Sequence, residues 1–115
     1  MKDDRLYLIH IRDCLARAVK YASCGREQFM DSTMVQDAVI RNLQTLSEST
    51  QRLSDGLKAD HAEVNWRGIA GFRNVLVHGY LGLDLERVWE IVHRDLPGLQ
   101  TAVAGMLEKL DGEQR

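Results

Sequence analysis

The chain has 115 residues and carries 15 basic and 17 acidic side chains, so its formal net charge at pH 7 is −2. With 44% hydrophobic residues it holds enough apolar side chains for a buried core, which argues against disorder. The charge balance is not that of a typical nucleic-acid-binding domain, which is usually basic. The sequence contains no apolar run of membrane-spanning length, and we expect no signal peptide. We therefore expect one cytoplasmic domain over residues 1–115.

The spacing of apolar residues predicts helices along the first half of the chain. A helix is predicted from about residue 3 to residue 23, with one apolar face: Leu8, Ile11, Leu15, Ala18 and Ala22. A second is predicted from about residue 32 to residue 53, with a similar stripe: Val35, Val39, Leu43, Leu46 and Leu53. Residues 56–63 are expected to form a loop.

Three more helices are predicted in the second half. The first, from about residue 63 to residue 81, has two apolar faces, one with Ile69, Phe72 and Leu76 and one with Ala70, Arg73, Val77 and Tyr80. The second of these faces is expected to meet a partner chain. A further helix is predicted from about residue 85 to residue 94, and Pro97 is placed in the first turn of a last helix. The expected fold is an all-α, up-and-down bundle of four to five antiparallel helices.

The sequence offers no metal or cofactor motif. It contains no H-E-x-x-H, no C-x-x-C and no clustered acids at ligand spacing, so no metal ion and no cofactor are expected. The two cysteines, Cys14 and Cys24, are interpreted as buried or half-buried thiols.

One segment, residues 71–80, combines three reactive side chains. Two helical turns bring Tyr80 to within about 20° of Arg73, whereas an ideal helix turns His78 about 140° away. Gly79 permits a break that would let the His78 imidazole reach the same face. A guanidinium grips phosphate and an imidazole moves protons near neutral pH, which together suit phosphodiester chemistry. Alternatively, Arg73 forms a surface ion pair, His78 caps the helix and Tyr80 is an edge of the core.

The pattern R-x-x-x-x-H-x-Y, with asparagine after the arginine, resembles the signature of the HepT family in the HEPN superfamily. The flanking sequences are similar too: Ile69 to Asn74 reads IAGFRN and a later stretch reads LDLERVWEIV. Upstream, Ala38 to Ser49 resembles the family's second helix and ends near its glutamate, here Glu48. Serine stands at position 47, where relatives often carry glycine.

This resemblance implies a function and a set of site residues. HepT proteins are dimeric helical bundles, and many HEPN proteins are metal-independent endoribonucleases. HepT members are toxins, and a minimal nucleotidyltransferase (MNT) antitoxin silences them by transferring AMP to the motif tyrosine. Carried over here, Arg73 and His78 are the catalytic pair, Asn74 and Glu48 support them, and Tyr80 receives the AMP.

Two rival interpretations stay open at the level of sequence. One is a non-catalytic helical module that binds nucleotide, a nucleotidyltransferase partner, or both. The other is a purely structural dimerisation bundle. The ribonuclease interpretation also requires local positive potential for RNA, which Arg73 of both subunits would supply, with three further candidates. These candidates are Arg41, Lys58 and Arg67.

Overall fold

The computed structural model describes residues 2–78 and 84–113, and the side chains of residues 3–72 and 84–113. Within these ranges the chain is helical and contains no strand. The helices are α1 (Lys2–Ala22), α2 (Arg26–Asp31), α3 (Thr33–Gln51), α4 (Asp55–Asp60), α5 (Trp66–His78), α6 (Leu85–Glu90), the π-helical turn η1 (Ile91–Asp95) and α7 (Leu96–Glu113). This confirms the predicted all-α fold.

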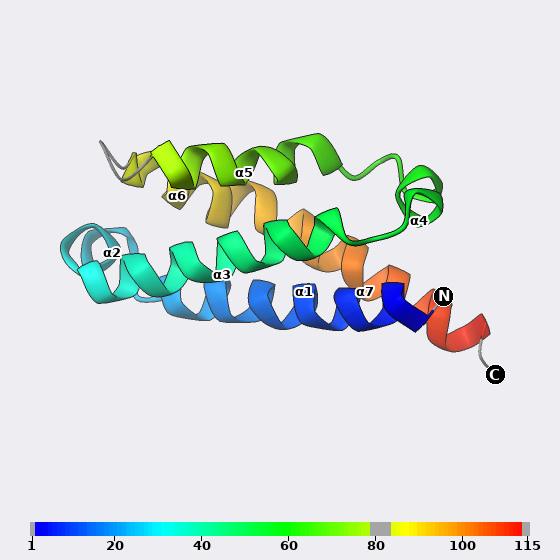
Figure 1. The fold of residues 1–115 in the computed structure, drawn as a ribbon. Coiled ribbons are helices and arrows are strands. Elements are labelled where there is room, and N and C mark those ends of the chain that lie inside the picture. Colours follow the sequence, from blue (N-terminus) through cyan, green and yellow to red (C-terminus); the bar gives the residue numbers. More distant parts are fainter. Residues whose placement is uncertain (1, 79–83, 114–115) are drawn as a thin grey trace.

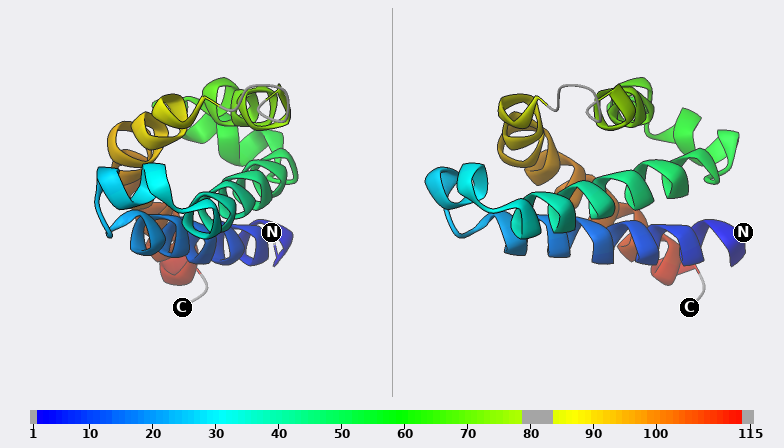
Figure 2. Two further views of the ribbon diagram at one scale, coloured as in Figure 1. Left: turned by 90° about the vertical axis from the view of Figure 1, so that its left-hand side faces the viewer. Right: turned by 60° about the vertical axis from the view of Figure 1, so that its left-hand side comes forward.

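The long helices run up and down along an elongated molecule of 47 × 25 × 20 Å (Figure 1). Helix α3 packs along α1 on one side and α5 on the other, and α7 packs against α1 (Figure 2). The short helices α2 and α4 close the two ends of α3. None of the described helices is long and apolar enough to cross a bilayer.

The predicted apolar faces form the core. Every residue expected on the first helix face is buried, and Val39, Leu43, Leu46 and Leu53 of the second stripe are buried as well, with Val35 packed at the margin. On α5, Ile69 and Phe72 are buried, which confirms that face as far as the structure describes it. Leu76, Val77 and Tyr80 lie outside the described side chains.

Two short helices were missed by the sequence prediction. The first of them, α2, follows Gly25, whose φ of 98° suits glycine and ends α1 as expected. Gln36 then holds the end of α2, since its side-chain amide donates to the carbonyls of Phe29 and Met30 at 2.9 and 3.0 Å.

The predicted loop at residues 56–63 was partly wrong, because residues 55–60 form α4. Ser54 caps this helix by accepting from the Leu57 amide. In addition, the buried Asp4 carboxylate accepts from the amide and hydroxyl of Ser54.

The fourth and fifth predicted helices are one continuous rod. Residues at the junction keep right-handed helical dihedrals, and the Leu96 amide donates to the Ile91 carbonyl, five residues back. Pro97 lacks an amide proton and crowds the carbonyl four residues before it. A wider π turn just before Pro97 accommodates this crowding without breaking the helix. The predicted break between residues 94 and 97 was therefore wrong, although Pro97 does lie in the first turn of α7.

The cysteines differ in environment. Cys14 is buried, and burial raises the pKa of its thiol. Cys24 is exposed, so the prediction of a buried or half-buried thiol was wrong at this position. Cys24 lies two residues beyond the last residue of α1, where the chain turns toward Gly25 and leaves the core.

Candidate functional site

The motif residues occupy the C-terminal half of α5. Arg73 and Asn74 lie in the middle of this helix, and His78 is the last residue of the helix. Their side chains, and Tyr80 altogether, lie outside the described residues. The structure therefore describes the contacts that hold α5 in place and the residues that surround its first half.

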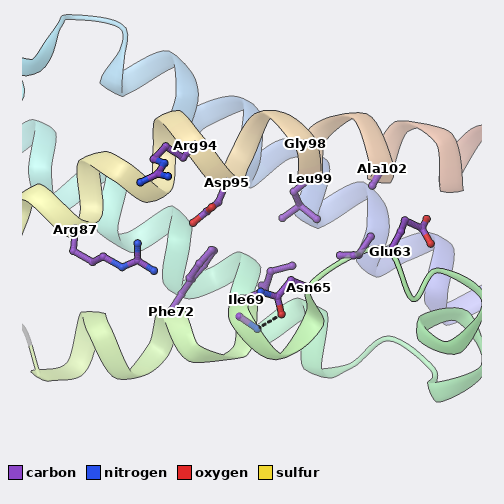
Figure 3. Close-up of a pocket in the computed structure, with 12 residues that line it drawn as sticks. Glu63, Asn65, Ile69, Phe72, Arg87, Arg94, Asp95, Gly98, Leu99 and Ala102 are labelled. Atoms are coloured by element: carbon purple, nitrogen blue, oxygen red, sulfur yellow. Dashed lines mark hydrogen bonds between the residues drawn. The ribbon is translucent and has the colours of Figure 1, made fainter.

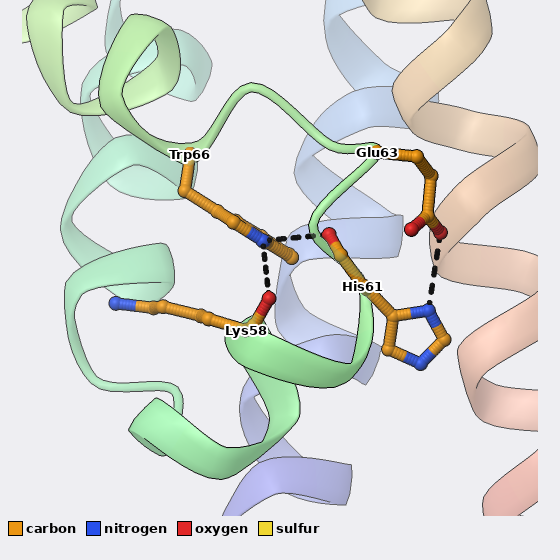
Figure 4. Close-up of polar contacts among 4 residues, drawn as sticks. All are labelled: Lys58, His61, Glu63 and Trp66. Carbon is orange, nitrogen blue, oxygen red and sulfur yellow. Dashed lines mark hydrogen bonds and ion pairs between the residues drawn. The ribbon is translucent and has the colours of Figure 1, made fainter.

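The N-terminus of α5 is fixed by side-chain contacts. The Asn65 side chain accepts from the Gly68 amide at 2.9 Å, which satisfies one of the free amides of the first turn. The Trp66 indole donates to the carbonyls of Lys58 and His61, at 3.2 and 3.0 Å, and so ties α5 to α4 (Figure 4). Trp66 is half-buried against the core.

The connection before α5 carries a small polar pair. His61 Nδ1 lies 3.3 Å from Glu63 Oε1 (Figure 4). The pKa of Glu63 lies below its ordinary value, first because its own backbone amide binds the carboxylate and second because His61 does. Both contacts favour the charged carboxylate. Their contribution to the stability of the fold is therefore present above the ordinary carboxyl pKa and is lost as the pH falls.

Midway along α5, a buried hydroxyl joins this helix to α3. Ser47 is 2% exposed and its hydroxyl donates to the Ile69 carbonyl at 3.0 Å. In a helix the same carbonyl accepts from the amide of residue 73, which is the motif arginine. The serine at position 47 thus fits between the helices and bonds the turn of α5 that leads into the motif.

We expect Ser47→Ala to lower the free energy of unfolding by about 1 kcal/mol, because one buried hydrogen bond is lost while the Ile69 carbonyl keeps its helical partner. Urea denaturation measures this change. Thr45→Ala is the matched control, since Thr45 bonds only the Arg41 carbonyl of its own helix. Equal stability of the Ser47→Ala and wild-type proteins would show that the contact contributes nothing.

A pocket of about 420 Å³ lies between the first half of α5 and the rod of α6, η1 and α7 (Figure 3). Its apolar wall includes the buried side chains of Ile69, Phe72 and Leu99. Its charged residues are Glu63, Arg87, Arg94 and Asp95, all exposed to solvent. Phe72 directly precedes the motif arginine in sequence, so the pocket adjoins the motif half of α5.

The remaining predicted site residues are dispersed. Glu48 is exposed on α3, and among the described side chains none is within hydrogen-bond distance of it. Arg41 and Arg67 are exposed and Lys58 is half-buried. Arg87 and Arg94, which both line the pocket, were not predicted from the sequence. Their seven-residue spacing, typical of one helix face, was the only signal available.

Another aromatic group lies where α2 meets α6. The rings of Phe29 and Trp89 are 5.3 Å apart, and the His93 ring stacks on Trp89 at 3.8 Å. Trp89 is half-buried against the core. Among the described residues, no three His, Cys, Asp or Glu side chains cluster in a way that could hold a metal ion.

Comparison with known families decides which fold family this bundle represents. The family described as Ribonuclease HepT-like matches residues 11–106. The chain belongs to this family. The matched span includes the motif segment 71–80, so the resemblance predicted from that segment is confirmed.

Relatives of the HepT-like chain are found in archaea and bacteria. A Caldanaerobacter subterraneus protein whose name designates it a candidate RNase is 30% identical over 110 residues, 95% of this chain and 98% of the relative. A Thermococcus cleftensis protein named probable ribonuclease HepT is 36% identical over 84 residues, 73% of each chain. A Methanocaldococcus jannaschii protein, named gamma-glutamylcyclotransferase and candidate RNase, is 32% identical over 111 residues. The chain spans only half the length of that last relative. No solved structure matches the chain significantly.

Proposed function

We propose that this HepT-like chain is a metal-independent endoribonuclease whose cutting site contains Arg73 and His78. The observation that carries the proposal is the R-x-x-x-x-H-x-Y segment, whose Arg73 and His78 lie on α5, in a chain of the ribonuclease HepT-like family. The names of the relatives support the same activity. A cytoplasmic location and a homodimer belong to the proposal.

The proposed reaction is attack of an RNA 2′-hydroxyl on the adjacent phosphorus. A base takes the proton of the 2′-hydroxyl, an acid protonates the departing 5′-oxygen, and Arg73 stabilises the charge of the pentavalent phosphate. The products are a 2′,3′-cyclic phosphate and a 5′-hydroxyl. One chain has a single motif imidazole, whereas a two-fold dimer places two copies of His78 in one cleft, one as base and one as acid.

The test is cleavage of end-labelled RNA by the purified protein in the presence of EDTA. The proposal predicts products that end in 2′,3′-cyclic phosphate. RNA that is bound but left intact would instead identify a non-catalytic module that binds nucleotide or a partner. Cleavage that stops in EDTA and leaves 3′-hydroxyl ends would contradict the proposed chemistry.

The regulation that we propose follows from Tyr80. A cognate MNT nucleotidyltransferase, the antitoxin of this toxin, transfers AMP from ATP to the phenol oxygen and releases pyrophosphate. The added phosphodiester charge and adenosine would repel or block RNA. Intact-mass measurement after incubation with the transferase and ATP tests this step. Mass increments of AMP that are absent from Tyr80→Phe support it, and their persistence in Tyr80→Phe would refute it.

A further inference from the structure

The pocket beside the motif half of α5 has the size and lining of a ligand site. Its volume of about 420 Å³ lies within the range of small-molecule pockets, about 300–1,000 Å³. One part of its wall is apolar, through Ile69, Phe72 and Leu99, and charged side chains stand around that part. This combination suits a flat, partly apolar group with charged substituents.

The charges of the pocket are unevenly distributed. Arg87 and Arg94 lie toward the C-terminal half of α5, whereas Glu63 lies at the opposite end, near the start of that helix (Figure 3). Arg87 also lies 3.4 Å from Glu90 in an exposed contact, which leaves most of its guanidinium donors open to a ligand. The positive end of the pocket is thus the end nearest the motif. Guanidinium groups bind phosphate with paired hydrogen bonds.

Two of the charged lining residues come from the π-helical turn. Arg94 and Asp95 are the last residues of η1, the segment that precedes Pro97. Single π turns inside α-helices are frequent at functional sites. In Figure 3 the Asp95 carboxylate projects into the pocket between the arginines and Phe72. A carboxylate in this position accepts hydrogen bonds from the amino or imino groups of a nucleobase.

The pocket and the motif are adjacent along one helix. Residue 72 lines the pocket and residues 73 and 78 carry the proposed cutting groups, which places all three within about 9 Å along the axis of α5. A neighbouring nucleotide of an RNA strand cut at the motif would need to reach only about this far to enter the pocket.

We propose that the pocket is an RNA subsite that holds a nucleotide next to the cleaved bond. Arg87 and Arg94 bind the phosphate, the wall of Ile69, Phe72 and Leu99 covers the base, and Asp95 accepts from its edge. The proposal rests on the ribonuclease function proposed above, and its test is a binding measurement that does not depend on cleavage.

Gly98 offers a way to fill the pocket without disturbing the fold. It lines the pocket, and a Cβ built on it meets no atom within 4 Å. Gly98→Leu therefore occupies the pocket and also raises helix propensity. Gly105→Leu is the matched control, because Gly105 is in the same helix, has equally open surroundings and does not line this pocket. The control for the arginine variants is Arg52→Ala, because Arg52 is exposed and does not line the pocket.

The experiment measures the affinity of each variant for a fluorescent 2′-O-methyl RNA oligonucleotide, which cannot be cut, over a series of salt concentrations. We expect Gly98→Leu to weaken binding about tenfold, while Gly105→Leu binds as the wild type does. Arg87→Ala and Arg94→Ala should each reduce the slope of log affinity against log salt by about 0.7, and Arg52→Ala should not.

Wild-type affinity in Gly98→Leu and in both arginine variants would overturn the subsite and leave the ribonuclease proposal intact. If Gly98→Leu changes the oligomeric state in solution and leaves the RNA affinity unchanged, the subsite is also overturned, because a second copy of the chain would then occupy the pocket. Wild-type protein that neither binds nor cleaves RNA would refute both proposals together.

Discussion

Replacing His78 by alanine is expected to lower the rate of RNA cleavage by about 10²–10⁴-fold, the usual contribution of a general acid or base. Arg73→Ala should lower the cleavage rate by a similar factor, because it removes the group that stabilises the developing charge on the phosphate. Single-turnover cleavage of labelled RNA measures both rates. Arg73→Lys should recover only part of the loss, since lysine keeps the charge and lacks the planar fork.

The controls separate catalysis from folding. Arg52→Ala removes an exposed arginine elsewhere and should cleave at the wild-type rate. The melting temperatures of the His78 and Arg73 variants should stay close to that of the wild type. If these variants fold and still cleave at the wild-type rate, the assignment of the motif as the cutting site is wrong.

Phe29→Ala is expected to cause the largest loss of stability, about 3–5 kcal/mol. Phe29 is fully buried, is the only buried residue that α2 contributes, and packs its ring 5.3 Å from that of Trp89. Its removal leaves a cavity and releases a six-residue helix that is too short to persist alone. Urea denaturation followed by tryptophan fluorescence measures the loss and reports on Trp89.

Met34→Ala provides the comparison for this prediction. Met34 is 78% exposed on α3, so its truncation should change the free energy of unfolding by no more than about 0.5 kcal/mol. A Phe29→Ala protein as stable as Met34→Ala would mean that α2 is not anchored through this ring.

The long helices were predictable because their apolar faces repeat over several turns. The stripe from Leu8 to Ala22 and the stripe from Val39 to Leu46 each mark one buried face. Helices α2 and α4 have six residues each, which is too few for a periodic pattern, and their stability comes from contacts such as that of Gln36. Pro97 was expected to separate two helices, but the π turn before it keeps one rod continuous.

The same contrast between local and long-range information applies to the candidate site. Arg73 and His78 could be proposed from the sequence because they lie close together in it, in a pattern similar to that of a known family. Arg87 and Arg94 could not, because their proposed role depends on how the rod of α6, η1 and α7 faces α5. The contact of Ser47 with Ile69 likewise joins residues 22 positions apart. Periodicity along one helix carries no information about which residues of another helix it will meet.

In the proposed enzyme, two copies of the motif at the end of α5 form one RNA-cutting cleft. The most direct measurement is the cleavage rate of a mixed dimer, with one wild-type and one His78→Ala subunit, isolated through two different affinity tags. If one imidazole acts as base and the other as acid, the mixed dimer should cleave nearly as slowly as the His78→Ala homodimer. Half or more of the wild-type rate would contradict the shared cleft and show that each subunit cuts RNA alone.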